Sequence, residues 1–139
     1  MGLLVQFLLG ALVRHQHAGL ACPKFPNCLS EFLPIPFTGA TFLAFTHRWW
    51  GVLLIGVFVH IFSTSRKESK HLARVGSFLF ILTFVQVLLG ISTVHSGLGT
   101  VLRATHAAAG YGLWAVLFYM TLRAGALQGL WNKTNASSS

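Results

Sequence analysis

Four long apolar stretches run through the chain, and they restrict what it can fold into. They cover residues 1–18, 41–63, 75–94 and 105–122 of 139. A helix of about 20 apolar residues crosses the hydrocarbon core of a bilayer. In that core every backbone N–H and C=O group needs an internal partner, and an α-helix supplies it within one segment. The sequence therefore predicts four transmembrane helices.

Composition favours a membrane protein over a soluble one. Hydrophobic residues make up 54% of the chain and charged residues only 9%, whereas about a quarter of the residues in a soluble domain are charged. The two acids, Glu31 and Glu68, leave a net charge of +8. Such a charge can indicate nucleic-acid binding, but here the basic residues flank the apolar stretches and form no soluble basic domain. We therefore expect an integral membrane protein with no nucleic-acid partner.

The first stretch has a second interpretation, as a cleavable signal peptide. Residues 18–21, with the sequence "AGLA", resemble a cleavage region. A signal peptide normally begins with a positively charged segment, and no basic residue precedes the apolar run here. We therefore expect the stretch to be retained as the first helix, interrupted near its end by Arg14, His15 and His17.

Basic residues between the stretches set the expected orientation. The short link between the second and third stretches carries Arg66, Lys67, Lys70 and Arg74. Cytoplasmic loops are enriched in Lys and Arg, so this link and both termini are expected in the cytoplasm of a multi-pass protein of the cell membrane. The loop 19–39 and the turn 95–102 then face outward.

Short connections between successive helices favour antiparallel neighbours. We therefore predict an all-α fold, a transmembrane antiparallel four-helix bundle, in one domain over residues 1–125. The chain ends in the polar run "WNKTNASSS". Residues 126–139 are accordingly predicted to be a disordered cytoplasmic tail.

Several polar residues are expected at one depth of this bundle, near its outer end. His47 and Arg48 lie in the first turns of the second helix, and His106 lies at the start of the fourth. Arg14, at the end of the first helix, and Arg103, just before the fourth, come to the same level. Almost no carboxylate is present to neutralise these cations. Because ionisable groups inside a membrane are costly and usually functional, the cluster indicates an anionic ligand.

A heme has the chemistry that such a cluster needs. Neutral imidazoles of His47 and His106 on facing helices can bind iron from opposite sides of the ring plane, and arginine binds carboxylates such as propionates through paired hydrogen bonds. Gly51 and Gly110 each follow a histidine by four residues, so they lie one turn away on the same face and leave room for a flat ring. Small residues also let helices pack closely in lipid, so the glycines alone leave both interpretations open.

The remaining histidines carry weaker predictions. His60 lies about 20 Å along the helix axis from His47, so the two cannot share a site. His71 falls in the basic cytoplasmic link. Three more lie on the outer side, where they could border the ligand, relay protons or have no role: His15, His17 and His95.

The expected outer loop holds the chain's two cysteines, in the run "LACPKFPNC". On the oxidising side of a membrane, Cys22 and Cys28 are expected to form a disulfide, and a small ring of this kind can be redox-active. Metal ligation is the competing interpretation, but two cysteines are an incomplete set of zinc ligands.

Four segments together resemble the heme A synthase family of cytochrome oxidase assembly. They are "LGALVRHQHAGLACPKFPNC", "THRWWG", "LLGISTVHSGLG" and "THAAAGYG", which span nearly the whole chain in the family's order. The resemblance implies a membrane protein that oxidises the C8 methyl group of heme O to the formyl group of heme A, on the outer side. It also implies a histidine pair, here His47 and His106, and often a disulfide in the first outer loop.

The chain departs from the family pattern in two ways. Members usually have eight helices in two similar halves, so the resemblance is to a half-length variant, and a homodimer or a higher homo-oligomer would restore the full arrangement. Heme O synthase and oxidase assembly factors are further partners that the resemblance suggests. In the catalytic half of typical members a glutamate lies three residues before the second helix's histidine, whereas this chain has Ala44 there. His15 and His17 are then the candidates for proton transfer.

Two other functions remain open from the sequence. A non-catalytic b-type cytochrome or heme carrier would use the same histidine pair without oxidising the heme. A thiol–disulfide protein would use Cys22 and Cys28 instead. Heme, as heme b or as heme O and heme A, is the expected cofactor or substrate in the first two interpretations.

Overall fold

The computed structural model describes residues 1–25, 28, 33, 35, 37–68 and 70–136. This part of the chain forms helices and no strand. The elements are α1 (Gly2–His15), the 3₁₀ helix η1 (Ala18–Leu20), α2 (Gly39–Glu68), α3 (Lys70–His95) and α4 (Thr100–Ala136). The prediction of an all-α fold is confirmed.

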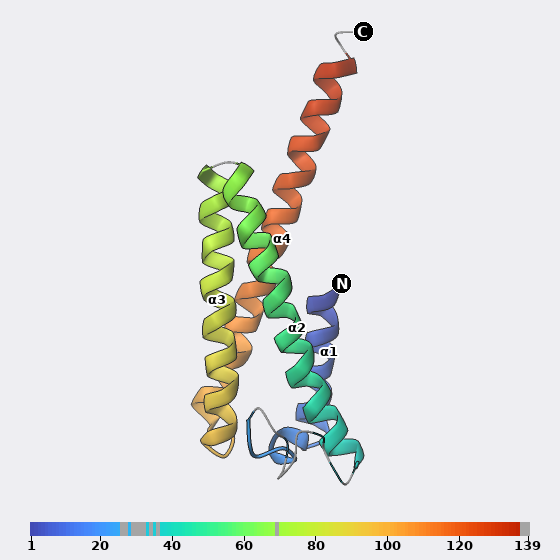
Figure 1. The fold of residues 1–139 in the computed structure, drawn as a ribbon, viewed down its shortest axis with the longest axis vertical. Helices are drawn as coiled ribbons and strands as arrows, with labels where there is room; N and C mark the ends of the chain where they lie inside the picture. The colour runs from blue at the N-terminus through green and yellow to red at the C-terminus, as the bar shows by residue number, and fades with distance from the viewer. Residues whose placement is uncertain (26–27, 29–32, 34, 36, 69, 137–139) are drawn as a thin grey trace.

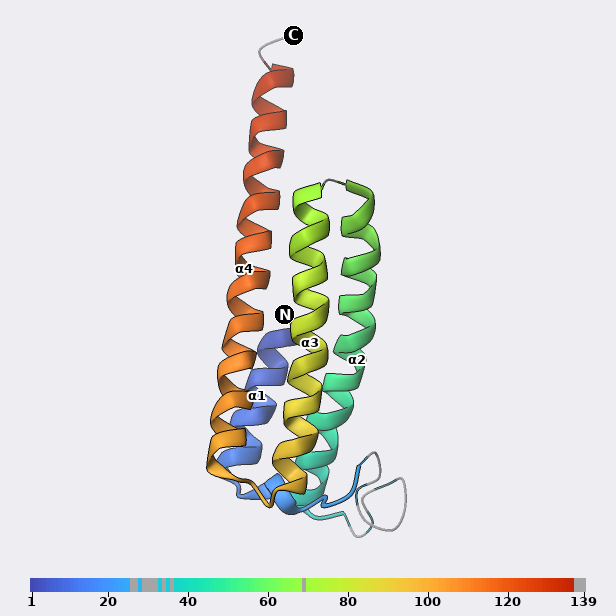
Figure 2. The ribbon, with the colours of Figure 1, turned by 90° about the vertical axis from the view of Figure 1, so that its left-hand side faces the viewer.

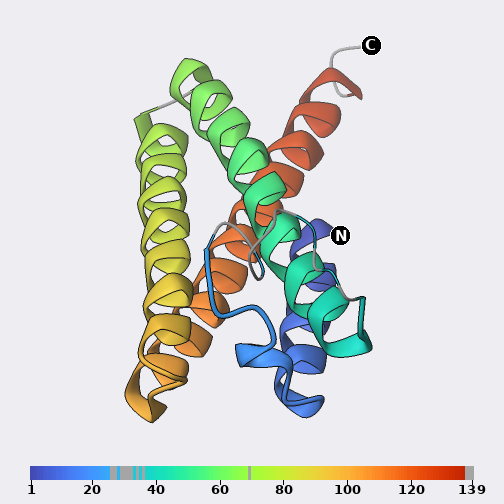
Figure 3. The ribbon, with the colours of Figure 1, turned by 60° about the horizontal axis from the view of Figure 1, so that its bottom comes forward.

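The four α-helices pack side by side as a bundle. α2 and α3 form a long antiparallel hairpin, α4 runs back beside α3, and the shorter α1 lies beside α2 (Figures 1 and 2). The 3₁₀ helix η1, which follows α1, lies at one end of the bundle, where α2 and α4 begin and α1 and α3 end (Figure 3). We call this the loop end. The indole nitrogen of Trp50 donates a hydrogen bond of 2.8 Å to the carbonyl oxygen of Gly2, which joins α1 to α2.

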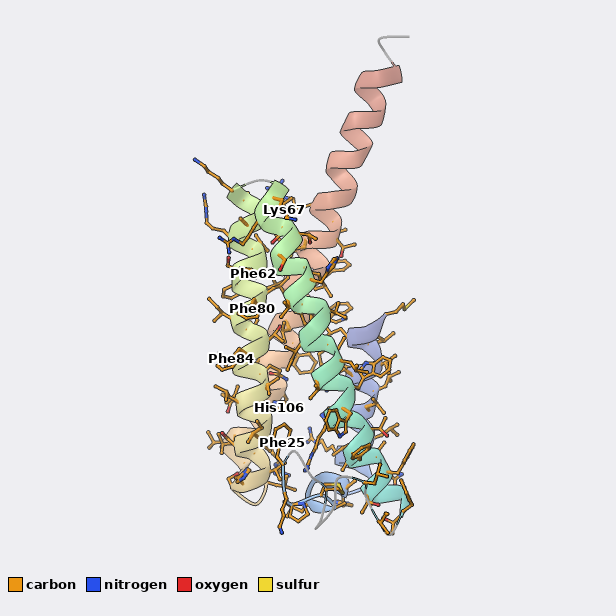
Figure 4. The ribbon with its side chains drawn as sticks, in the orientation of Figure 1. Phe25, Phe62, Lys67, Phe80, Phe84 and His106 are labelled. Carbon is orange, nitrogen blue, oxygen red and sulfur yellow. A yellow bond between two sulfur atoms is a disulfide. The ribbon has the colours of Figure 1, made fainter. Side chains whose placement is uncertain are left out.

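The bundle has one shared apolar core. Each α-helix contributes one buried residue to it, and these are Leu3, Phe58, Leu79 and Leu113. Nearer the link between α2 and α3, the rings of Phe62 and Phe80 stack with centroids 5.1 Å apart (Figure 4). Because each helix contributes a buried side chain to the same cluster, the four helices form one packed unit.

The outer surface of the bundle is strongly apolar. Large side chains on it are well exposed, among them Leu53 at 64%, Ile81 at 59% and Phe84 at 61%. Apolar side chains over the whole outer surface are typical of a protein surrounded by lipid. α2 (over Gly39–Lys67) and α3 are each long and apolar enough to cross a membrane. Within the described residues, α1 and α4 are not among the helices that meet these criteria of length and hydropathy. α1 is apolar but has only 14 residues.

The helix boundaries differ from the predictions at several ends. The first helix stops at His15 rather than at 18, and α2 and α3 continue almost to each other. α4 extends to Ala136, so the prediction of a disordered tail is wrong for residues 126–136. These residues continue an established helix and include alanine, leucine and glutamine, which favour helical structure, so adding turns needs no new nucleus. The rest of the predicted tail, residues 137–139, lies outside the described residues.

Candidate functional site

The two histidines that the sequence paired come together inside the loop end. His47 lies about two turns into α2, and His106 lies nearly two turns into α4. Both helices start at the loop end, so similar distances along them give similar depths (Figure 4 labels His106). Both imidazoles are partly buried, and each lies against a glycine of a neighbouring helix, His47 against Gly10 of α1 and His106 against Gly90 of α3. The structure thus brings two nitrogen donors from opposite helices to one place.

A backbone carbonyl holds the ring of His106 in a defined orientation. The Nδ1–H of His106 donates a hydrogen bond of 3.1 Å to the carbonyl oxygen of Gln86. That bond leaves Nε2 as the free nitrogen, which is the usual way in which proteins fix a metal-binding tautomer. His47 lies next to the backbone of Gln6 in the same manner, but its buried Nδ1 has no hydrogen-bond partner in the described part of the chain.

Two glycines allow the rings to lie this close to α1 and α3. A Cβ atom built on Gly10 would lie 3.1 Å from Cε1 of His47. A Cβ atom built on Gly90 would lie 3.1 Å from Cε1 of His106. Both distances are shorter than ordinary van der Waals contacts. The missing side chains at these two positions therefore make the ring positions possible, a role that the sequence-based prediction did not assign.

The glycines that the sequence did single out have different neighbours. A Cβ atom on Gly51 would lie 3.2 Å from Nε2 of Gln6, and one on Gly110 would lie 3.1 Å from Nε2 of Gln86. The space that we expected these glycines to leave for a flat ring is therefore taken up by glutamine amides. The Oε1 atoms of both glutamines are buried without a hydrogen-bond partner in the described part of the chain.

These contacts reveal an internal repeat. The run "QFLLG" at 6–10 matches "QVLLG" at 86–90, and "THRWWG" at 46–51 matches "THAAAG" at 105–110. Residues 1–10 and 81–90 have the same order of buried, intermediate and exposed positions. The pair α1–α2 thus repeats as the pair α3–α4, with Gln, Gly and His in equivalent places.

The repeat was missed at the sequence level because its spacing changes. Equivalent residues are 80 positions apart in the first helix of each pair (6 and 86) but 59 apart in the second (47 and 106). The difference comes from the connections, since α1 and α2 are separated by a long loop and α3 and α4 by residues 96–99. The signal that would have found it is the shared motif Gln-x₃-Gly followed by His-x₃-Gly.

The three predicted arginines are all at the loop end, in different surroundings. Arg48 is partly buried, and its guanidinium donates hydrogen bonds to the carbonyl oxygens of Lys24, at 2.6 Å, and of Cys22. It therefore holds the cysteine loop against α2. Arg14, in the last turn of α1, and Arg103, in the first turn of α4, are exposed. These two keep their guanidinium groups accessible to an anion.

A disulfide closes the cysteine loop beside the histidines. Cys22 and Cys28 are joined, which confirms the predicted bond. Both are buried, at 0% and 1% exposure, and they pack against Ala44, one turn before His47 on α2. The position of the family's glutamate is therefore filled by a small apolar residue under the disulfide.

Comparison with known proteins identifies the family. Residues 1–118 match the family described as cytochrome oxidase assembly protein. The chain belongs to this family. It is 31% identical over 114 residues to the heme A synthase of Symbiobacterium thermophilum, and 30% identical over 116 residues to those of Bacillus mycoides and of Bacillus cereus strain AH187.

Each of these alignments covers 81% of this chain but only 37% of the relative. The chain therefore spans little more than a third of the length of the curated relatives that it matches. No solved structure matches it.

In this member of the family, the other histidines are exposed, whereas the pair is partly buried. His60 is exposed on α2, away from the interior. His15 and His17 are exposed at the loop end, and so is His95, whose Nδ1 bonds the carbonyl oxygen of Ile91 at 3.0 Å. The described residues hold no cluster of three or more His, Cys, Asp or Glu side chains that could bind a metal ion.

A groove of about 470 Å³ lies elsewhere, between α3 and α4. Its walls are His71, Arg74, Val75, Phe78, Ala115, Val116 and Tyr119. It begins near the link between α2 and α3, and it offers a single histidine. The groove therefore lacks the pair of nitrogen donors found at the loop end.

The disulfide leads to a direct chemical prediction. Labelling of the purified, oxidised protein with a thiol reagent is expected to modify neither Cys22 nor Cys28, and labelling after reduction and unfolding should modify both. Mass spectrometry of the labelled peptide measures this. Full labelling without a reductant would contradict the structure.

Proposed function

We propose that this chain binds heme O between His47 and His106 and oxidises its C8 methyl group to the formyl group of heme A. The observation that carries the proposal is the meeting of these two imidazoles, from α2 and α4, in a member of the family. The matched relatives are heme A synthases.

The residues at the site fit a heme. The two imidazoles lie at a similar depth of the bundle, and the Nδ1 of His106 is occupied by a backbone carbonyl, which leaves Nε2 for iron. The described part of the site holds no acidic side chain, so the donor set suits an iron porphyrin better than an isolated divalent cation. Bound heme would supply a redox-active iron and the methyl group that is oxidised.

The chain's own residues hold and orient this ligand. His47 and His106 are the proposed axial ligands. Arg14 and Arg103, exposed at the loop end, are proposed to bind the propionates, because guanidinium groups form strong charge-assisted bonds with carboxylates. Arg48 acts indirectly, by holding the backbone of Cys22 and Lys24 against α2.

Oxidation of the methyl group to a formyl group, with water as the source of the oxygen atom, removes four electrons and four protons (R–CH3 + H2O → R–CHO + 4 H+ + 4 e−). The reaction therefore requires an external electron acceptor, such as a membrane quinone, and a proton acceptor near the ligand. Ala44 cannot accept a proton, and it is buried under the disulfide. We propose that His15 or His17 takes the role of proton acceptor, since both are exposed at the loop end and an imidazole is a common general base.

The proposed setting is the cell membrane, with the loop end outward and the link between α2 and α3 in the cytoplasm. The basic residues of that link support this orientation. We further propose that a second copy of the chain pairs with the first, because homodimers with two-fold symmetry are the commonest assemblies.

The structure argues against a thiol–disulfide function. Exchange requires that an attacking thiolate reach one of the sulfur atoms. Both cysteines are essentially unexposed, and the ring they close packs against Ala44 and Phe45. The disulfide is therefore in a position to stabilise the loop end rather than to react.

Production of heme A in cells tests the proposal. The chain is expressed in a host that makes heme O but lacks a heme A synthase of its own. The extracted hemes are then separated and identified by mass spectrometry. Heme A or its hydroxylated precursor is expected to accumulate, and to disappear with His47→Ala. If the folded, heme-loaded protein yields only heme B and heme O, the chain is a heme carrier or b-type cytochrome instead.

A further inference from the structure

The repeat leaves two buried polar atoms that the proposed ligation does not use. They are the Oε1 atoms of Gln6 on α1 and Gln86 on α3. A buried acceptor without a donor is costly, and native proteins leave few of them. In a membrane protein, polar groups in the interior of the bundle commonly mark the path or site of a ligand. The two amides occur at equivalent places of the repeat, so we look for a single reason why both Oε1 atoms lack a partner.

The two amides lie deeper in the bundle than the histidines. Gln6 comes one turn before Gly10 on α1, which runs toward the loop end, and its amide packs on Gly51, one turn beyond His47 on α2. Gln86 is placed in the same way on α3, with its amide against Gly110. One helical turn is about 5.4 Å. The amides are therefore about this far inward from the imidazole pair.

The two helix pairs α1–α2 and α3–α4 contact each other at the depth of the two glutamines. A Cβ atom on Gly110 would meet Nε2 of Gln86 at 3.1 Å and the ring of Phe7 at 3.6 Å. Phe7 is the neighbour of Gln6, and its ring also stacks on Tyr111 with centroids 5.5 Å apart. The inner wall of the site thus combines aromatic surface with two hydrogen-bond acceptors.

The site therefore has two chemically different ends. Toward the loop end it has the exposed cations Arg14 and Arg103, and inward it has an apolar wall with the acceptors of Gln6 and Gln86. A ligand that fits has anionic groups on one edge and a hydroxyl on the opposite edge. A heme with propionates on one edge and a hydroxyalkyl substituent on the other matches this distribution, and heme O is such a heme.

We infer that Gln6 and Gln86 form a subsite that accepts a hydrogen bond from the hydroxyl of a 1-hydroxyalkyl substituent on the heme, and so determine the preference for heme O over heme B. The inference rests on the proposed heme binding at His47 and His106. Heme B carries a vinyl group at this position, which has no proton to donate. Its binding leaves the acceptors unpaired, whereas a hydroxyl satisfies one of them.

Two synthetic hemes isolate the hydroxyl from the long hydrocarbon tail of heme O. Iron hematoporphyrin carries 1-hydroxyethyl groups, and iron mesoporphyrin carries ethyl groups in the same places. Each is titrated into the purified full chain, and the dissociation constant is measured from the change in the Soret band. We expect the hydroxyethyl form to bind about tenfold more tightly or better, the ratio expected when a buried acceptor gains a partner.

Variants of the two glutamines test whether their amides cause the preference for the hydroxyethyl heme. Gln6→Met and Gln86→Met keep side-chain length and flexibility but remove the amide. Each is expected to lower the preference, and the double variant to bring the ratio of dissociation constants close to one without loss of the low-spin spectrum. Gln16→Met is the matched control, because Gln16 is exposed beyond the last residue of α1 and should leave the ratio unchanged.

The outcomes separate this inference from the proposed function. If the wild-type protein binds both hemes as low-spin complexes with equal affinity, the subsite is refuted while heme ligation stands. The same holds if the preference survives in the double variant, in which case the two amides pair with water or with each other. If the wild-type protein binds neither heme, both proposals are overturned.

Discussion

Replacing His47 or His106 by alanine is expected to abolish the low-spin spectrum of the heme-loaded protein. Two nitrogen ligands, one on each side of the iron, give a strong ligand field and a low-spin complex. Removal of one imidazole leaves a single axial ligand, and the spectrum becomes high-spin or the heme is lost. Because the two residues occupy equivalent positions of the repeat, we expect similar effects from both variants.

Absorption and electron paramagnetic resonance spectra of the purified variants measure this loss. His60→Ala serves as the control, since His60 lies on the same helix as His47 but is exposed on the outer surface. It should keep the wild-type spectrum. A low-spin spectrum that persists in both the His47 and the His106 variant would rule out this pair as the axial ligands.

Gly10→Ala and Gly90→Ala are expected to weaken heme binding by about 10- to 100-fold, the usual range for changes to groups that orient a metal ligand. The added methyl group would lie 3.1 Å from Cε1 of the adjacent histidine, so the ring has to move. In the Gly90 variant this movement also strains the bond from Nδ1 of His106 to the carbonyl oxygen of Gln86. A shifted ring cannot place Nε2 as before, and we expect a mixed-spin spectrum.

Gly56→Ala is the matched control for these two variants. Gly56 lies on α2 like His47, but a Cβ atom there would meet nothing within 4 Å. The substitution should leave the spectrum unchanged, and it should stabilise the helix slightly because alanine favours helical structure over glycine. Heme affinities and spin states of all three variants are compared in one set of titrations. Unaltered affinity in both the Gly10 and the Gly90 variant would show that the rings do not depend on these contacts.

The repeat gives these predictions a common structural basis. Each half of the bundle supplies one imidazole, one glycine that receives it and one glutamine deeper in the interior. A flat ligand held between two such halves contacts equivalent groups on both sides. The two halves differ at the loop end, where only the first carries the disulfide loop and Arg48. This difference makes the loop end asymmetric.

Several features of the protein follow from the sequence alone. The apolar stretches predicted helices because a buried or lipid-exposed backbone has to satisfy its own hydrogen bonds, which is a local requirement. The matched depth of His47 and His106 followed from counting residues along antiparallel helices, since each residue adds a fixed rise. The bond between Cys22 and Cys28 followed from their short separation in a loop expected on the oxidising side.

Only the tertiary structure decided which groups surround those histidines. The contacts of Gly10 with His47 and of Gly90 with His106 depend on how each helix is rotated about its axis, and side-chain packing between helices sets that rotation. The binding of Arg48 to loop carbonyls joins residues far apart in the chain, so no local pattern encodes it. The sequence thus determined which residues could act and at what depth, whereas interhelical packing decided which of them meet.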